Sequence, residues 1–155
     1  MGTSWLKRST ILGACALLSS ASGAGAQTTS GYQPASSGTR ELTLGSGTVI
    51  KMLLDASVLG TDGVEVAEIT FPAGASSAGH RHGAMEMFYV VEGVLGHVVN
   101  GVEHRLEPGM AGVVKPTDQV EHRVLEGPLK VVVIWVPGGE GDRIAPRERW
   151  RALGG

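Results

Sequence analysis

The sequence predicts an all-β protein with one sandwich-like or barrel-like domain. Short apolar runs recur between about residue 48 and residue 136, and Gly, Pro, Asn and Asp separate them. The chain has 24 glycines and few aromatic residues in 155, which suits a sheet with many tight turns. Regularly spaced short strands are typical of β-sandwiches and barrels. The length fits one ordinary domain.

The N-terminal segment differs from the rest of the chain. Lys7 and Arg8 precede a short apolar run, residues 11–18, and an A-x-A cleavage pattern ends at Ala26. These features predict that residues 1–26 are a secretory signal peptide, too short and too poor in large apolar residues to span a membrane. We therefore expect a periplasmic or secreted protein with no integral membrane span.

Cys15, the only cysteine, allows a second interpretation of this segment. Residues 12–15 loosely resemble a bacterial lipobox, in which case Cys15 would carry a lipid anchor. Cleavage after Ala26 would leave no cysteine and therefore no disulfide. It would also remove two of the 13 basic residues, so that 11 remain against 15 acidic ones, a net charge of −4. Because no basic tract is present, nucleic acid is not expected as a partner.

The rest of the chain divides into three parts by composition. Residues 27–40 are rich in Thr, Ser, Gly and Pro and are predicted to form a flexible linker. Residues 41–137 are expected to form the β-domain. Residues 138–155 form a C-terminal tail, in which residues 144–153 are expected either as a short helix or as a segment draped over the domain. The candidate strands are Thr48–Leu54, Val64–Phe71, Met85–Glu92, Leu95–Val99, Ala111–Lys115, Glu121–Leu125 and Leu129–Val136.

Turn residues indicate where these strands end. Asn100-Gly101 lies between two strand-like runs and predicts a hairpin, because both residues tolerate positive φ. Glu92-Gly93 is predicted to form another tight turn, and Gly127-Pro128 to break the chain again. The run 131–136 is almost continuously apolar, which predicts a strand buried on both faces.

Two histidines and a carboxylate lie within seven residues of one another. His80, His82 and Glu86 have the same parity, so in an extended strand they would face the same side of a sheet. A further histidine, His122, follows later in the chain. Three imidazoles and one carboxylate can hold a divalent transition metal and leave positions open for water or substrate. A metal centre is therefore the first hypothesis for function.

The spacing of these residues belongs to a longer pattern. Gly74, His80, His82, Glu86 and Gly93 follow one another with five, one, three and six residues between them. This pattern resembles the first conserved motif of the cupin superfamily at every position. Five residue types at fixed gaps form a far more specific signal than two histidines alone.

The second cupin motif is matched in part. Gly109 fits its opening glycine, Pro116 lies one place late, and His122 comes two residues later than the family spacing. We therefore expect a longer loop, residues 117–121, at the pocket mouth. The resemblance implies a single-domain jelly-roll (cupin) β-barrel with one interior divalent transition metal, which is Fe, Mn, Ni, Cu or Zn in such families. The ligands carried over are His80, His82, Glu86 and His122.

Other residues near the motif receive weaker assignments. His97 is expected either to line the pocket and donate a hydrogen bond to a metal ligand, or to pack on the sheet. His104 is expected to be exposed. Arg81 is expected to face away from the pocket, which leaves Lys115 as the one nearby cation. Because few charges and many apolar residues are expected in the interior, we predict an apolar pocket for a small molecule. The interior candidates are Met52, Leu54, Ile69, Phe71, Phe88, Val90, Val113, Val124 and Trp135.

The resemblance implies three possible functions. The first is an oxygenase, in which an apolar or aromatic enol, phenol or thiol binds the metal and Glu86 stays bound or takes a proton. The second is a metal-dependent isomerase, lyase or decarboxylase. The third is a non-catalytic barrel that binds a small molecule. The resemblance also suggests a homodimer, formed through sheet faces or through exchange of the N-terminal strands at residues 41–54.

Overall fold

A computed structural model describes Met1 and residues 37–153 of the chain. The predicted signal peptide and most of the predicted linker lie outside these residues. No helix in the described part is long and apolar enough to cross a membrane. The elements are β1 (Arg40–Thr43), β2 (Val49–Leu54), α1 (Ala56–Leu59), β3 (Glu65–Phe71), β4 (Met85–Val99), β5 (Val102–Leu106), β6 (Ala111–Val114), β7 (Val120–Val136), α2 (Glu140–Ile144), the 3-10 turn η1 (Arg147–Arg149) and β8 (Arg151–Ala152).

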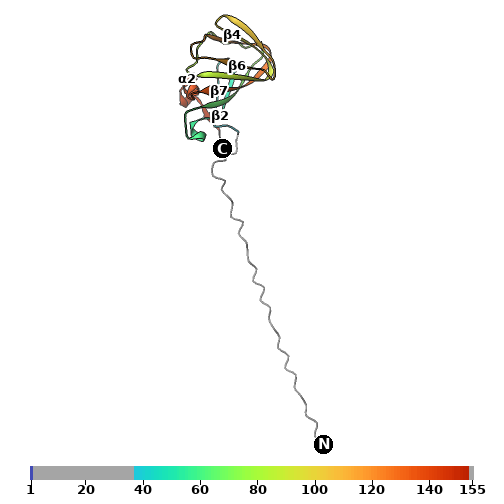
Figure 1. The fold of residues 1–155 in the computed structure, drawn as a ribbon, viewed down its shortest axis with the longest axis vertical. Coiled ribbons are helices and arrows are strands. Elements are labelled where there is room, and N and C mark those ends of the chain that lie inside the picture. Colours follow the sequence, from blue (N-terminus) through green and yellow to red (C-terminus); the bar gives the residue numbers. More distant parts are fainter. Residues whose placement is uncertain (2–36, 154–155) are drawn as a thin grey trace. The chain divides into compact units, whose positions relative to one another are not determined.

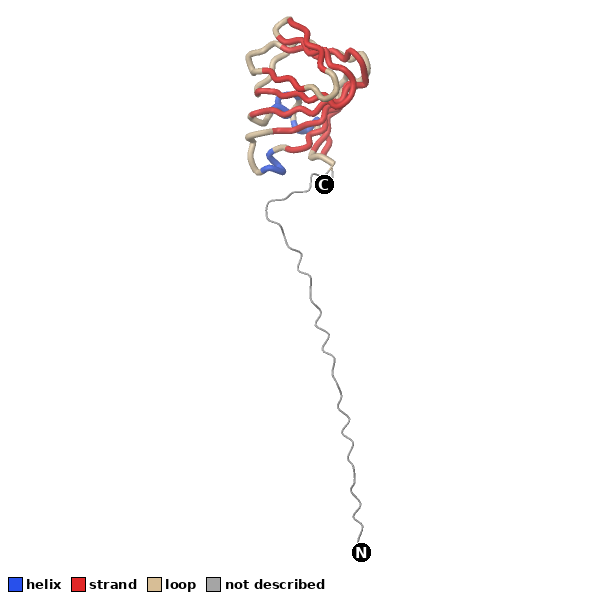
Figure 2. The backbone as a smooth tube through the Cα atoms, turned by 45° about the vertical axis from the view of Figure 1, so that its right-hand side comes forward, coloured by secondary structure: helices blue, strands red, loops and turns tan. Residues whose placement is uncertain are grey.

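The strands form one antiparallel sheet that curls into a barrel, as the sequence predicts (Figures 1 and 2). Their order is β5-β4-β7-β3-β2-β1-β8, and β6 adds to the first half of β4. Figure 2 shows that helix is confined to short segments between or after the strands. The jelly-roll architecture is thereby confirmed.

Two long strands, β4 and β7, run through both halves of the barrel. They pair with each other over nearly their whole length, from Met85 opposite Val136 to Val99 opposite Val120. The first half of β4 also pairs with β6, and its second half pairs with β5. Both strands therefore contribute residues to each layer of the barrel. The metal-site residues Glu86 and His122 lie on these two strands.

The sequence predicts four shorter strands where the structure has these two. Gly93 does not make a hairpin turn: it lies inside β4 at a register shift, with φ of 77°. A Cβ at this position would lie 2.5 Å from the carbonyl oxygen of Pro128, so only glycine fits. Gly127-Pro128 lies opposite, inside β7. Because a bulge bends a strand and keeps it paired, two predicted chain breaks are bends in continuous strands.

The core forms where the inward faces of the strands meet. Met52, Phe88, Val90 and Trp135 are almost fully buried, as predicted. Val113 is instead 61% exposed, because the register of β6 turns its neighbour Val114 inward. The apolar run 131–136 alternates between buried and half-buried positions, so one face of β7 is fully buried rather than both. Leu54 is half-buried, and the remaining predicted interior residues, Ile69, Phe71 and Val124, are buried.

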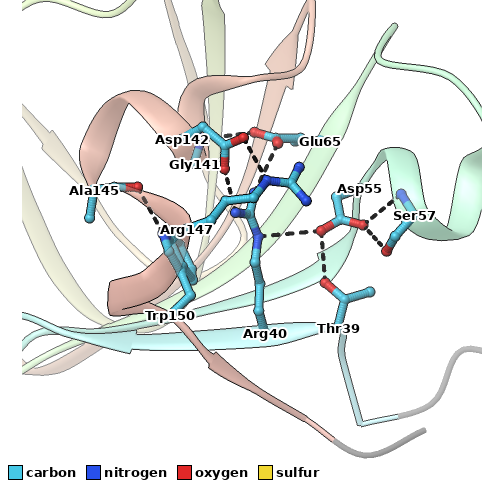
Figure 3. A network of polar contacts seen from close by, with 10 residues as sticks. All are labelled: Thr39, Arg40, Asp55, Ser57, Glu65, Gly141, Asp142, Ala145, Arg147 and Trp150. Carbon is cyan, nitrogen blue, oxygen red and sulfur yellow. Dashed lines mark hydrogen bonds and ion pairs between the residues drawn. The ribbon is translucent and has the colours of Figure 1, made fainter.

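The C-terminal tail is structured and packs on the barrel. Its α2 begins just after β7, and β8 pairs with β1 at the edge of the sheet. Arg40, placed by composition at the end of the linker, instead opens β1 and is buried. Its guanidinium contacts the carboxylates of Asp55, Glu65 and Asp142 (Figure 3). We call these four residues the Arg40 cluster.

The face of the Arg40 guanidinium is covered from the tail. Its Cζ lies 4.5 Å from the centre of the Trp150 ring, and the Trp150 indole donates to the Ala145 carbonyl over 3.1 Å (Figure 3). The Arg40 cluster therefore joins β1, β3, α2 and the residues after α2.

Candidate metal centre

Three histidines from distant parts of the chain converge inside the barrel. His80 and His82 lie in the loop between β3 and β4, and His122 lies on β7. One ring nitrogen from each of the three histidines lies within 4.8 Å of those of both others. The three histidines that the sequence predicts as ligands therefore lie together, although His80 and His82 lie in a loop and not in the expected strand.

His80 presents Nε2 to this cluster. Its Nδ1 lies 2.9 Å from the carbonyl oxygen of Ala78, which can only accept a hydrogen bond. Nδ1 therefore carries the proton in neutral His80, and Nε2 keeps the lone pair that a metal needs. His80 is half-buried, and its backbone is fixed by a bridge to Val120.

His122 is held by its backbone and by aromatic neighbours. Its N–H donates to Ser77 Oγ over 2.8 Å, and the Ser77 N–H donates to the His122 carbonyl over 2.9 Å. The ring lies 5.1 Å from that of Phe88 and 6.0 Å from that of Phe71. Burial, and then the nearby histidines, lower the pKa of His122 well below its ordinary value. The imidazole is therefore neutral, the form that coordinates a metal.

His82 lies between two buried carboxylates. Its Nδ1 is 3.2 Å from Oε1 of Glu140, and its Nε2 is 2.7 Å from Oε2 of Glu86. Burial opposes protonation of the ring, but these carboxylates outweigh it and raise the pKa of His82 to about 9. Without a metal, a proton therefore occupies the nitrogen that faces the cluster.

Glu86 is fixed through its other oxygen. Oε1 accepts a hydrogen bond of 2.7 Å from the indole N–H of Trp135, which is opposite Glu86 in the β4–β7 register. Glu86 is 1% exposed. Its Oε2 is left facing His82.

Several buried side-chain atoms in and beside this cluster lack a hydrogen-bond partner among the described residues, Nε2 of His97 included. Nε2 of His82, Nε2 of His122 and Oε2 of Glu86 are all buried and lack a hydrogen-bond partner among the described residues. Although the His82 and Glu86 atoms are close, they lack hydrogen-bond alignment. Each such group costs on the order of 1–3 kcal/mol when left unsatisfied. One ring nitrogen each of His80, His82 and His122 lie within 4.8 Å of one another, so these three histidines fit a metal ion. Glu86 lies beside this group, with Oε2 2.7 Å from Nε2 of His82, and is not part of it.

The cluster opens into a cavity of about 410 Å³. Apolar side chains form much of its wall, and Ser46, Thr48, Ser76 and Ser77 add hydroxyl groups. Its size is that of a small-molecule pocket. The lining residues are Leu44, Ser46, Thr48, Ile50, Ile69, Phe71, Ser76, Ser77, His80, Arg81, His82, Glu86, His122, Trp135, Glu140, Arg143 and Ile144.

Two arginines line the cavity, which differs from the expectation that Lys115 is the one nearby cation. Arg81 lines the cavity, although alternation along a strand would have turned it away, because residues 80–84 do not form a strand. Arg143 of α2 lines it too. Lys115 is not among the lining residues. The loop 117–121 is also absent from the wall: Asp118 and Gln119 bind Asn100 at the β4–β5 turn instead.

The two remaining histidines have different environments. His97 is 2% exposed, lies outside the cavity wall and packs 5.0 Å from the Phe88 ring. Burial, and then the charges of His104, His82 and His80, lower its pKa to about 4. It therefore packs on the sheet, one of the two expected alternatives. His104 is exposed, as predicted.

Glu140 is the residue of the site that the sequence did not indicate. It lies 58 positions from His82, in a Gly-rich stretch with no periodic pattern. Only the fold brings it to the site. A glutamate that follows the last long strand is only a weak signal in the sequence. Whether its side chain is buried cannot be inferred from a single residue.

The fold and the histidine cluster define a small barrel of the double-stranded β-helix class with a candidate interior metal site. The family model described as "Cupin domain" matches residues 67–137. The chain belongs to the cupin superfamily. Cupins commonly bind a divalent metal, which agrees with the His80, His82 and His122 group. No curated protein sequence matches this chain.

Solved structures show the same fold. KdgF from Halomonas sp. has a TM-score of 0.58 at 22% identity, over 65% of this chain and 88% of that one. An RmlC-like cupin from Shewanella frigidimarina has a TM-score of 0.57 at 25% identity, over 66% and 87%. An RmlC-like cupin with a double-stranded β-helix fold from Methanocaldococcus jannaschii has a TM-score of 0.52 at 15% identity, over 64% and 86%.

Proposed function

We propose that the protein is a metal-dependent enzyme that binds one divalent transition metal through His80, His82, Glu86 and His122. The observation that carries this proposal is that one ring nitrogen each of His80, His82 and His122 lie within 4.8 Å of one another. Glu86, whose Oε2 lies 2.7 Å from Nε2 of His82, is added as the fourth ligand on the basis of the sequence motif. Imidazole and carboxylate together suit Fe, Mn, Ni, Cu or Zn. The small molecule would bind in the adjoining cavity.

The reaction that we propose first is oxygenation of an apolar or aromatic enol, phenol or thiol. A bound metal would supply an open position where such a group is acidified and brought close to O₂. Apolar residues of the wall, such as Ile50, Ile69 and Phe71, would hold the ring and exclude water. Glu86 would either stay bound or leave the metal so that Oε2 takes the substrate proton, while the Trp135 hydrogen bond keeps the carboxylate oriented.

The arginines of the cavity favour a second candidate, a metal-dependent isomerase, lyase or decarboxylase. Arg81 and Arg143 line the cavity and suit a substrate that carries a carboxylate, although Nε of Arg143 also lies 3.6 Å from Glu140. Such a reaction needs no oxygen. A non-catalytic barrel that binds the same kind of small molecule is the third candidate, and it predicts binding without turnover.

Metal content tests the proposal directly. Protein purified without chelator and reconstituted with each divalent metal should contain about one ion per chain by mass spectrometry, as expected for a single mononuclear site. His80→Ala should lose the metal. His104→Ala, which changes an exposed histidine outside the site, is the matched control and should keep it. Unchanged metal in His80→Ala would refute the assignment.

Oxygen uptake separates the reaction classes. Metal-loaded protein is incubated with flavonol, catechol and thiol panels and, separately, with small carboxylic acids under nitrogen. Oxygen consumption with the first panels supports the oxygenase. Turnover under nitrogen supports the second candidate. Thermal shifts without turnover support a binding barrel.

We propose a periplasmic or secreted location, on the basis of the signal-peptide pattern in residues 1–26. N-terminal sequencing of the protein from a bacterial periplasm would test it. A start at Gln27 supports the proposal, and a lipid-modified Cys15 would replace it with a membrane-anchored form.

We also propose a homodimer through the outer face of the sheet. Outward side chains on β6, β4 and β7 are apolar at paired positions: Val113, Met87 and Ile134 are neighbours, and Tyr89 is 49% exposed nearby. Homodimer interfaces are more apolar and less charged than ordinary surface. A two-fold axis would place this face against its copy. The alternative, exchange of β1, is less supported because β1 is paired within its own chain.

Light scattering tests the dimer. Val113→Glu should convert it to a monomer. Val102→Glu, at an equally exposed valine on β5 outside that face, is the matched control and should not. A monomeric wild type at micromolar concentration would refute the proposal.

A further inference from the structure

Glu140 contacts the metal site from outside the segment that the family model matches. It is the first residue of α2 and is 4% exposed. Its carboxylate contacts three groups: Oε1 faces Nδ1 of His82 over 3.2 Å, and Oε2 accepts from the Gly83 N–H over 2.9 Å and lies 3.6 Å from Nε of Arg143. The Glu140 carboxylate therefore lies behind a histidine of the cluster, on the side of the ring opposite Glu86.

This contact determines which nitrogen of His82 faces the site. A carboxylate can only accept, so Nδ1 of His82 carries the proton and Nε2 keeps its lone pair for the metal once its own proton is displaced. The bond to Gly83 fixes the backbone next to the ring. Together these two bonds set both the tautomer and the orientation of His82.

The position of Glu140 is in turn set by the Arg40 cluster. The Gly141 N–H donates to Glu65 Oε2 over 2.9 Å, and Asp142 binds Arg40. A Cβ on Gly141 would lie 2.7 Å from Met52 and 2.8 Å from the Arg40 guanidinium, so a glycine lets α2 sit this close. Three consecutive residues of α2 therefore each contact a buried partner.

We propose that Glu140 is a positioning residue of the metal centre, through which the C-terminal segment sets metal affinity. The inference rests on the proposed function, since it needs His82 to be a ligand. Carboxylates that accept from metal-binding histidines typically change metal affinity by about 10–100-fold when removed.

Zinc affinity, measured by competition with a chromophoric chelator, tests this role. Glu140→Gln should weaken Zn²⁺ binding by about 10–100-fold. Asp142→Asn, two residues away on the same helix, weakens the contact of α2 with Arg40 but leaves the carboxylate at His82, and should reduce the affinity less than Glu140→Gln does. Equal affinity of Glu140→Gln and the wild type would overturn the proposal. So would an equal loss in Asp142→Asn, because Glu140 would then act only by anchoring the helix.

A measurement on the wild type keeps the test open if Glu140→Gln does not fold. Long-range ¹H–¹⁵N spectra of the Zn²⁺-loaded protein should show His82 with its proton on Nδ1. Metal on Nδ1 of His82 would overturn the proposal. If the wild type binds neither zinc nor any of the other four metals, the metal assignment fails and not the role of Glu140 within it.

Discussion

The barrel contains two buried groups of charged and titratable side chains, and they differ in how they are paired. In the Arg40 cluster, one guanidinium lies within ion-pair distance of the carboxylates of Asp55, Glu65 and Asp142, so each carboxylate has a cation beside it, although the acids outnumber the base (Figure 3). In the histidine cluster, His82, His122 and Glu86 each leave a buried atom without a hydrogen-bond partner among the described residues. Arg40 Nε also lacks a hydrogen bond, but it lies 3.3 Å from a carboxylate oxygen of Asp55. No ion pair among the described residues includes His122, so a bound cation can satisfy the histidine cluster in a way that the Arg40 cluster does not need.

This difference suggests separate roles. A closed network of buried charges is strongly destabilised when one partner is removed, because the others stay buried and unpaired. Buried atoms without hydrogen-bond partners, in contrast, can be satisfied by a bound ion. We expect mutations in the Arg40 cluster to affect folding first and mutations in the histidine cluster to affect metal content first.

The largest effect is expected from Arg40→Ala. It would leave Asp55 and Glu65 buried without their cation, and should lower the free energy of unfolding by about 3–5 kcal/mol. Urea denaturation of the metal-free protein measures this. Arg105→Ala removes an exposed arginine that also pairs with two carboxylates, and serves as the control with a much smaller change. Equal losses of unfolding free energy in the two variants would show that the ion pairs of the Arg40 cluster stabilise the fold no more than exposed ones do.

Metal addition should act on the histidine cluster alone. At a free metal concentration one hundred times the dissociation constant, the wild type should gain about 2.7 kcal/mol of stability. Calorimetry with and without Zn²⁺ measures the gain. His122→Ala should lose it. An equal gain in that variant would place the metal elsewhere.

The pH dependence of metal-free stability should have a maximum near pH 6.5. The pKa of His82 is raised to about 9 in the folded protein, so its contribution is present below pH 6.5 and lost as the pH rises through 9. The pKa of His97 is lowered to about 4, so its contribution is present above pH 6.5 and lost as the pH falls toward 4. Urea titrations in EDTA between pH 5 and 9.5 measure both limbs. His82→Gln should flatten the alkaline limb only, and an unchanged limb would contradict the contacts of His82.

The smallest effect is expected from Ser77→Ala. It removes the hydroxyl that accepts from the His122 backbone, a neutral hydrogen bond worth about 1 kcal/mol. Urea denaturation should show that loss, with metal still bound at about one ion per chain, because the His122 ring keeps its aromatic neighbours. Complete loss of the metal would mean that Ser77 matters to the site far more than one bond.

The sequence predicted the fold and the histidine cluster because both depend on local patterns. Alternation and turn residues located most strands, and fixed spacing located His80, His82 and Glu86. The parity argument assumed an extended strand, which is wrong because residues 80–84 form a loop. The side chains of His80 and His82 nevertheless lie together. What failed depended on register: one residue of shift turned Val114 inward in place of Val113.

Glu140 and Gly93 mark a different limit. Gly93 continues a strand because it meets the backbone of a distant residue, and Glu140 reaches His82 across 58 positions. Such contacts exist only once the barrel has closed. The metal-site assignment of Glu86 and the signal peptide stay predictions that the experiments above address.

The seating of α2 has one more consequence. Because Glu140, Gly141 and Asp142 join the histidines to the Arg40 cluster, ion occupancy and fraying of the last residues are thermodynamically linked, and each must shift the other by the same factor. Deuterium uptake at the Gly141 amide should therefore slow when zinc is added, and a chain cut after Pro137 should hold zinc more weakly.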